Sequence, residues 1–208
     1  MIGPLLAAGV AAQVIAWRLV VVGRAPFWRT VAAAWAILGA AALLLGDPAC
    51  CADHEVTTAM VVGAASGVLL YGATRTVVTV SSRWPALAGA VDAAYGRSAE
   101  VAPAAAWILT LGVAVPGEEV FWRGVVTPWL VDATPPVAGA ILAWAASAGV
   151  AAAWASIPFL AAAVVGGALW TALAIWSGGV LAPLASHLVW TACMIAWRPP
   201  APRAKVAA

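Results

Sequence analysis

The sequence predicts an all-α fold, a polytopic bundle of about seven transmembrane helices. Of its 208 residues, 65% are hydrophobic and only 9% are charged. A soluble domain carries roughly 25% charged residues, so this chain lacks the polar side chains that would cover a surface in water. Its apolar residues also gather into runs of about 20, the length of a helix that crosses roughly 30 Å of hydrocarbon.

Seven apolar runs predict the spans. They cover residues 4–22, 30–46, 57–74, 101–131, 137–154, 158–176 and 179–197. We interpret the first run as a span rather than a cleaved signal peptide, because no basic residue precedes it and it has no clear small-residue cleavage site. The whole chain, 1–208, is expected to form a single membrane domain.

The fourth run is unusual because its 31 residues are too many for one upright span. It must tilt, kink at Pro116 or extend into the interface. Proline cannot donate to the preceding helical turn, so Pro116-Gly117 is expected to loosen the helix at that point.

Segment 82–100 is the longest polar-leaning stretch, and the sequence leaves two interpretations of it open. Hydrophobic residues recur there at steps of three to four residues, as in an amphipathic helix that lies in the membrane interface. They are Trp84, Leu87, Val91 and Tyr95. The alternative is an ordinary ordered loop.

Loop charges predict the orientation. Basic residues lie in the first loop at 24–29, in the third loop at 75–97 and in the tail at 198–208, whereas the second loop has acidic residues only. With seven spans and an external N-terminus, every basic loop faces the cytoplasm, as the positive-inside rule requires. The tail 198–208 is therefore expected to be a short basic cytoplasmic segment.

The fourth run contains two adjacent carboxylates and an arginine, in the stretch Pro-Gly-Glu118-Glu119-Val-Phe-Trp-Arg123-Gly. A charge at the centre of a bilayer costs about 2.5–3.5 kcal/mol, so these side chains should face the protein interior. Glu119 and Arg123 are four residues apart and can pair on one helix face. Glu118 points about 100° away and can face a cavity.

His187 is the second polar feature, near the middle of the last span, and Thr191 follows one turn later on the same face. His187 and Glu118 lie at similar depths, so we expect them to meet between helices. Two carboxylates and an imidazole suffice to activate a water molecule, directly or through a metal. Alternatively, the same groups only lock the helices together by hydrogen bonds.

These two motifs resemble those of the CAAX-protease and bacteriocin-processing family of intramembrane metalloproteases. Glu118-Glu119-x-x-x-Arg123 resembles the first family motif, and His187-x-x-x-Thr191 resembles the late His-x-x-x-Asn/Asp motif. The resemblance covers about 75–200. It implies a helical bundle with a polar site in a cavity between helices at mid-membrane depth, and cleavage of a peptide bond, which in some members lies in a C-terminal CAAX tail.

The resemblance also assigns roles to residues. It makes Glu118 the base that activates water, with Glu119 and Arg123 as further catalytic residues. His187 binds a metal or orients the water, so His187 and Glu118 are the candidate ligands of a divalent metal, zinc. Expected partners are membrane lipid and a membrane-associated peptide or protein, not nucleic acid, in a bacterial-type plasma membrane.

The sequence departs from the family pattern at two positions. The middle motif, Phe-x-x-x-His, should fall in 137–154, but its nearest match ends at Trp154, and 137–176 contains no histidine. The late Asn/Asp is Thr191. Trp154 and Thr191 are therefore only supporting candidates. Two other functions stay open, an inactive relative that acts as a membrane binding or scaffold protein and, with less support, a transporter with a carboxylate proton relay.

Overall fold

The computed structural model describes residues 2–50, 53–81, 84–96 and 100–197. Every regular element in these ranges is helical, which confirms the predicted fold class. The basic tail 198–208, together with Arg83 and Arg97 of the third loop, lies outside the described residues.

Within the residues that the structure describes, six helical segments are long and apolar enough to cross a membrane. They are α1 (Ile2–Val21), α2 (Phe27–Leu45), α3 (Val56–Val80), the composite helix Pro103–Ala133, the segment Pro136–Trp154 that begins with α8 (Pro136–Val150), and α9 (Ile157–Ser177). A seventh apolar helix, α10 (Leu181–Ala196), is shorter, with 16 residues. Each of the seven predicted runs thus corresponds to one helical segment, and the last one is short.

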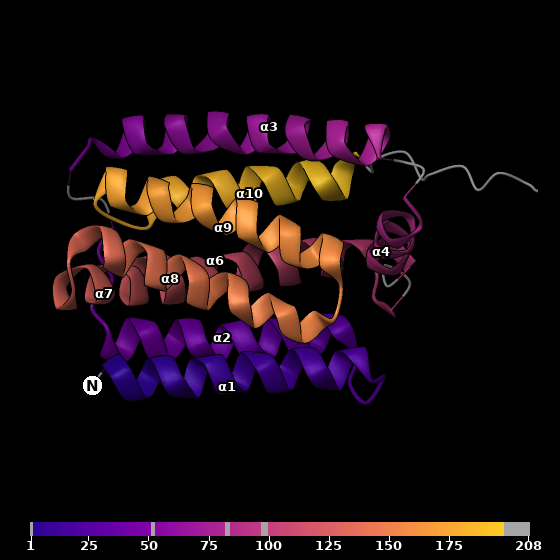
Figure 1. Cartoon of the computed structure of the whole chain (residues 1–208), viewed down its shortest axis with the longest axis horizontal. Coiled ribbons are helices and arrows are strands. Elements are labelled where there is room, and N and C mark those ends of the chain that lie inside the picture. The colour runs from indigo at the N-terminus through magenta and orange to yellow at the C-terminus, as the bar shows by residue number, and fades with distance from the viewer. Residues whose placement is uncertain (1, 51–52, 82–83, 97–99, 198–208) are drawn as a thin grey trace, which may run out of the picture.

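The helices lie side by side along the long axis of the molecule (Figure 1). In that view α1 and α2 form one flank and α3 forms the other, with α10 beside it and the composite helix, α8 and α9 between. The short helix α4 (Pro85–Gly96) lies at one end of the bundle. Of the two interpretations of segment 82–100, the helix is therefore confirmed for Pro85–Gly96. Its location at a membrane interface stays a prediction.

The composite helix changes its winding twice, each time just before a proline. It contains α5 (Pro103–Trp107), α6 (Val115–Glu119) and α7 (Thr127–Ala133), joined by the π-helical segments Ile108–Ala114 and Val120–Val126. The amide of Val115 donates to the Thr110 carbonyl and the amide of Thr127 to the Trp122 carbonyl, each five residues back. The predicted irregularity at Pro116 therefore takes the form of a π-helical stretch, a feature that is common at functional sites.

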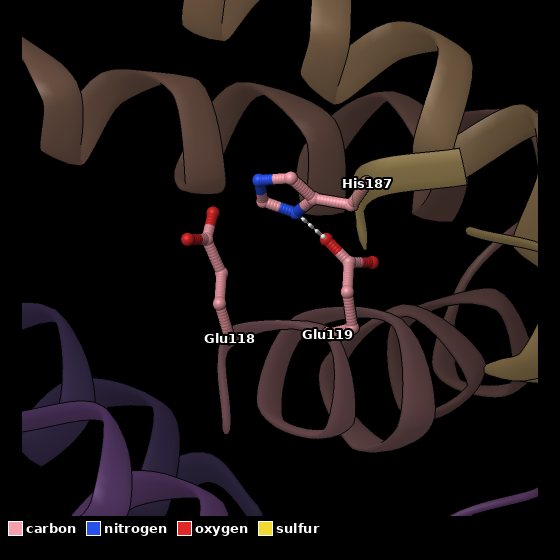
Figure 2. Close-up of side chains that lie close together, drawn as sticks. All are labelled: Glu118, Glu119 and His187. Atoms are coloured by element: carbon pink, nitrogen blue, oxygen red, sulfur yellow. Dashed lines mark hydrogen bonds and ion pairs between the residues drawn. The ribbon is translucent and has the colours of Figure 1, made fainter. Parts of the chain in front are cut away.

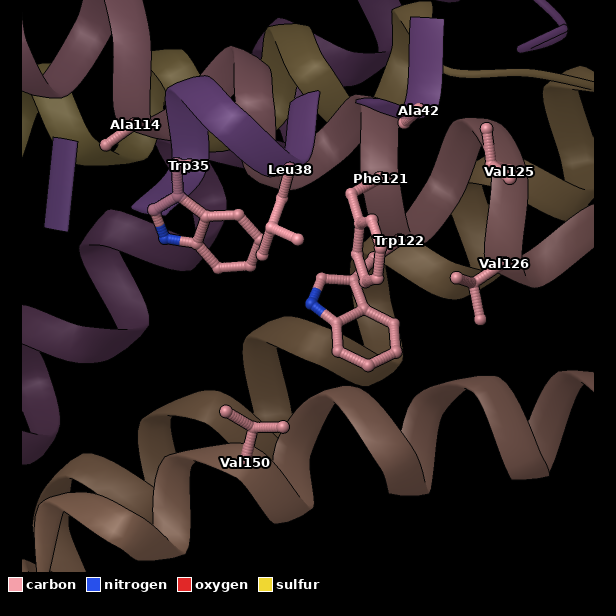
Figure 3. Packing of buried hydrophobic residues seen from close by; sticks show 9 residues of the cluster. All are labelled: Trp35, Leu38, Ala42, Ala114, Phe121, Trp122, Val125, Val126 and Val150. Atoms are coloured by element: carbon pink, nitrogen blue, oxygen red, sulfur yellow. The ribbon is translucent and has the colours of Figure 1, made fainter. Parts of the chain in front are cut away.

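α2 supports α6 through a close backbone contact. A Cβ atom on Gly117 would overlap the Trp35 carbonyl, and one on Gly39 would lie 2.7 Å from the Gly117 Cα. Around this contact Trp35 and Leu38 of α2 pack with Phe121 and Trp122 in the main hydrophobic cluster (Figure 3). The segment that carries the glutamates is therefore held against α2.

α3 supports α10 in a similar way. Cβ atoms on Gly63 and Gly67 would overlap the backbone of Ala182 and Ser186. The hydroxyl groups of Ser66 and Ser186 are hydrogen-bonded at 3.1 Å beside this contact. Small residues allow such approach between membrane helices, where close packing and interhelical hydrogen bonds stabilise association.

Candidate active site

The four candidate catalytic residues lie together between the composite helix and α10. Glu118 and Glu119 end α6, Arg123 lies in the π-helical segment that follows, and His187 lies in α10. Glu119 is 0% exposed, Arg123 2% and His187 6%. The Glu118 side chain keeps 29% of its surface exposed, so it is the accessible carboxylate of the pair.

His187 is oriented by Glu119. Its Nδ1 atom lies 2.7 Å from Glu119 Oε1. An ionised carboxylate only accepts hydrogen bonds, so Nδ1 donates and a neutral ring keeps its lone pair on Nε2. Figure 2 shows this second ring nitrogen on the side of the Glu118 carboxylate.

Arg123 offsets the charge of both glutamates. Its Nη1 atom lies 3.6 Å from Glu119 Oε1 and 4.0 Å from Glu118 Oε1. Its Nη2 atom donates to the Gly167 carbonyl at 3.5 Å. The predicted pairing of Glu119 with Arg123 is confirmed, and the same guanidinium is also within ion-pair distance of Glu118.

Glu118, Glu119 and His187 form a candidate metal-binding group. One ligand atom from each residue lies within 4.8 Å of the others. Metal bonds of about 2.1 Å would hold ligand atoms no more than about 4.2 Å apart, so only a small contraction would be needed. Nitrogen and carboxylate oxygen are ligands that suit a divalent cation such as zinc, and Glu119 Oε2 is buried without a hydrogen-bond partner. The residues therefore fit a divalent metal.

A cavity of about 600 Å³ lies beside this group. Glu118, His187 and Thr191 line it, while most of the remaining wall is apolar or aromatic. The volume is in the range of sites that bind small molecules and cofactors, roughly 300–1,000 Å³. Thr191 Oγ1 is buried without a hydrogen-bond partner. The cavity therefore presents a few polar groups in an otherwise apolar wall.

Residues 100–193 match the model of one protein family, described as Type II CAAX prenyl endopeptidase Rce1-like. The segment is Rce1-like. This match confirms the family resemblance, over a narrower range than the predicted 75–200, and it includes Glu118, Glu119, Arg123 and His187. No curated protein and no solved structure gives a match.

Trp154 lies just outside α8, at the end of the short 3₁₀ turn Ala151–Trp154. Its ring packs against Trp17, Phe27 and Phe159, with ring centroids 5.0, 5.7 and 5.2 Å away. It also lines the 600 Å³ cavity. Trp154, the nearest match in the sequence to the expected middle histidine, is thus part of an aromatic group in the cavity wall; that it occupies the position of that histidine stays a prediction.

Two residues near the site were missed by reasoning from ionisable groups and motifs. Gln13 of α1 is 3% exposed, its Nε2 atom has no hydrogen-bond partner, and it lines the cavity. It is the single amide side chain in the sequence and lies in an apolar run, which could have drawn attention to it. Trp170 of α9 stacks on His187, but nothing in the sequence distinguishes it from the other tryptophans.

Proposed function

We propose that this protein is a CAAX prenyl protease-like intramembrane endopeptidase. The observation that carries the proposal is the position of Glu118 and His187 in the wall of the same cavity, with Glu119 and Arg123 buried next to them. The Rce1-like match supports the same class of reaction.

In this proposal Glu118 is the base. A water molecule in the cavity gives a proton to the Glu118 carboxylate, and its oxygen attacks the peptide carbonyl carbon. The carbon–nitrogen bond then breaks, and Glu118 returns the proton to the leaving amine. Glu118 suits this role because it is the more accessible carboxylate.

The neighbouring groups prepare Glu118 and the water. Glu119 holds the His187 ring so that Nε2 can orient the water, and Arg123 lowers the cost of placing two carboxylates together. His187 and Glu118, with Glu119 next to them, would hold a divalent metal, zinc, which would supply Lewis-acid chemistry; Glu118 would bind it through one carboxylate oxygen and take the proton on the other.

The proposed substrate is a membrane-associated peptide or protein, since the cavity wall is largely apolar. We place the protein in a bacterial-type plasma membrane, surrounded by lipid, with its N-terminus outside and its C-terminus in the cytoplasm. Cys50 is exposed in the loop between α2 and α3, whereas Cys193 is half-buried. A membrane-impermeant thiol reagent should therefore label Cys50 in intact cells, and labelling only after lysis would reverse the orientation.

A second candidate function is an inactive relative that binds a membrane partner. The observation in its favour is that 137–176 contains no histidine, so His187 is the one imidazole at the site. A catalytic zinc usually has three protein ligands, and here two of the three would be adjacent glutamates. A transporter remains the weakest candidate, because no inverted repeat is evident in the sequence.

The test compares the purified full chain with Glu118→Gln. Each is assayed for bound metal and for cleavage of a panel of membrane peptides with and without a prenylated CAAX end. Cleavage by the wild type that Glu118→Gln abolishes is the expected result. Absence of cleavage, with a peptide still bound by both forms, would favour the binding protein.

The missing imidazole can be tested separately. Trp154→His offers a nitrogen at the position that the family motif indicates, and Phe159→His offers one elsewhere in the same aromatic group. We expect Trp154→His to raise metal occupancy above that of Phe159→His, as measured by elemental analysis. Equal occupancy would mean that Trp154 does not occupy the position of the family ligand.

A further inference from the structure

Trp170 makes the closest ring contact of the candidate site. Its ring centroid lies 3.7 Å from that of His187, with only 16° between the two planes. Trp170 is 5% exposed and belongs to a core cluster with Leu173 and Ala182. A near-parallel contact at this distance covers one whole face of the imidazole.

We infer that Trp170 is a positioning residue that fixes the plane of the His187 ring, an inference that rests on the proposed function. The ring is attached through Cβ, and the hydrogen bond to Glu119 holds a second point, Nδ1, but these two points still allow the ring plane to tilt about the line that joins them. The face contact with Trp170 opposes this tilt. Together the two contacts determine where Nε2 points, which is the side of the Glu118 carboxylate (Figure 2).

Trp170 is itself held in place from several directions. A Cβ atom on Gly166, one turn earlier in α9, would lie 3.1 Å from the Trp170 ring, so glycine leaves room for the indole. Trp190 packs its ring at 65° to that of Trp170, with centroids 5.8 Å apart. The Arg123 guanidinium carbon lies 5.6 Å from the Trp170 ring centroid, which is within cation–π range.

The simpler explanation is that Trp170 only fills the core. The two explanations differ in what a smaller aromatic ring would do. Trp170 Nε1 is buried without a hydrogen-bond partner, so Trp170→Phe keeps a flat face toward His187 and loses no bond. Trp170→Leu keeps an apolar side chain at this position but removes the flat aromatic face that contacts the His187 ring.

The chain offers a matched control at a distance from the site. His54 stacks on Trp176 with centroids 4.2 Å apart and 29° between the planes. His54 and His187 are the only two histidines in the sequence, so an NMR spectrum of the histidine Cε1–H groups contains two signals, and His54→Gln assigns them. Trp176→Leu therefore removes a comparable stack without touching His187.

The experiment uses the full chain in detergent and two readouts, histidine NMR and peptide cleavage. A face-stacked indole shifts the His187 ring protons upfield, so Trp170→Leu should move that signal downfield while Trp176→Leu moves only that of His54. Because a misplacement of 1 Å can cost about 100-fold in rate, Trp170→Leu should lower kcat about 10- to 100-fold with KM within about twofold. Trp170→Phe should stay within about threefold of wild type in kcat.

Two results would overturn the inference. One is an unmoved His187 signal in Trp170→Leu. The other is a folded Trp170→Phe whose kcat falls as far as that of Trp170→Leu, because the flat face would then not be the relevant property. If the wild type cleaves no peptide, the proposed function fails, and the inference is then tested on the line width of the His187 signal. A ring that has lost its fixed plane should give a broadened signal in Trp170→Leu and a sharp one in Trp170→Phe, and equally sharp signals in both variants would overturn the inference.

Discussion

The candidate site lies between α6 and α10, which are held by similar glycine contacts but differ in the regularity of their backbones. α6 packs on α2 through Gly39 and Gly117, and α10 packs on α3 through Gly63 and Gly67. The composite helix around α6 is irregular, with π-helical stretches on both sides of the glutamates. α10 is an unbroken α-helix from Leu181 to Ala196.

The difference shows two ways of placing a polar side chain in an apolar bundle. Glu118 and Glu119 are adjacent in the short α-helix α6 and share Arg123, but only Glu119 contacts His187, and π-helical stretches lie on both sides of the pair. His187 stands alone on a regular helix, and the side chains of Glu119 and Trp170 orient it. Changes to the backbone should therefore disturb the positions of the glutamates in α6 most. Changes to neighbouring side chains should disturb the orientation of His187 in α10 most.

The largest expected effect is on the reaction itself. Removing a general base typically costs about 10²- to 10⁴-fold, so Glu118→Gln should lower the rate of peptide cleavage by that factor. Glu100→Gln is the control, because that carboxylate accepts a hydrogen bond from the Phe27 amide outside the site. A Glu118→Gln rate within a few-fold of the control would assign the base elsewhere.

The next largest effect concerns Arg123. Breaking a buried ion pair costs about 3–5 kcal/mol, so Arg123→Ala should lower the midpoint of thermal unfolding in detergent substantially. The double variant Glu119→Gln with Arg123→Met leaves no charge unpaired at these two positions and should recover part of the loss. A single variant as stable as wild type would mean that the ion pair does not stabilise the fold.

A smaller effect, on stability, is expected at the two close helix contacts, that of α6 with α2 and that of α3 with α10. Overpacking typically costs about 1–3 kcal/mol, so Gly117→Ala and Gly67→Ala should both destabilise the protein. Gly112 and Gly72 lie in the same two helical segments, and a Cβ atom on either would meet nothing within 4 Å. Gly112→Ala and Gly72→Ala should leave the unfolding midpoint unchanged or raise it. An equal loss of stability in all four variants would mean that close backbone contact is not the cause of the destabilisation.

The smallest effect concerns the hydrogen bond between α3 and α10. Side-chain hydrogen bonds between membrane helices average about 0.6 kcal/mol, so Ser66→Ala should lower stability by about that amount. Ser81→Ala, at the end of α3, is the matched control. A Ser66→Ala loss several times larger would mean that this bond, rather than the glycine contact, positions α10.

The sequence predicted the helices and the meeting of the site residues, because both follow from strong constraints. Length and polarity in a bilayer determine where spans lie, and buried charges such as Glu119 and Arg123 must find partners. It did not predict the π-helical stretches, although a proline, at 116 and at 128, follows each of them closely in the sequence. Nor did it predict the stacking of Trp170 on His187, since contacts between α9 and α10 depend on packing that no periodic pattern records.

The loop between α2 and α3 has a consequence for how the bundle assembles. The Ala49 and Cys50 carbonyls accept hydrogen bonds from the Val180 and Leu181 amides, at 3.0 and 3.1 Å. The first of these contacts joins residues 131 apart in sequence (180 minus 49).

The first amides of a helix have no partner within that helix and are costly to leave unpaired in hydrocarbon. During synthesis α10 emerges after the other helices that the structure describes, and it forms these N-terminal hydrogen bonds only by docking onto a loop that was made earlier. Contacts this distant in sequence form slowly, so we expect the docking of α10, which brings His187 to the glutamates, to be a late step of folding.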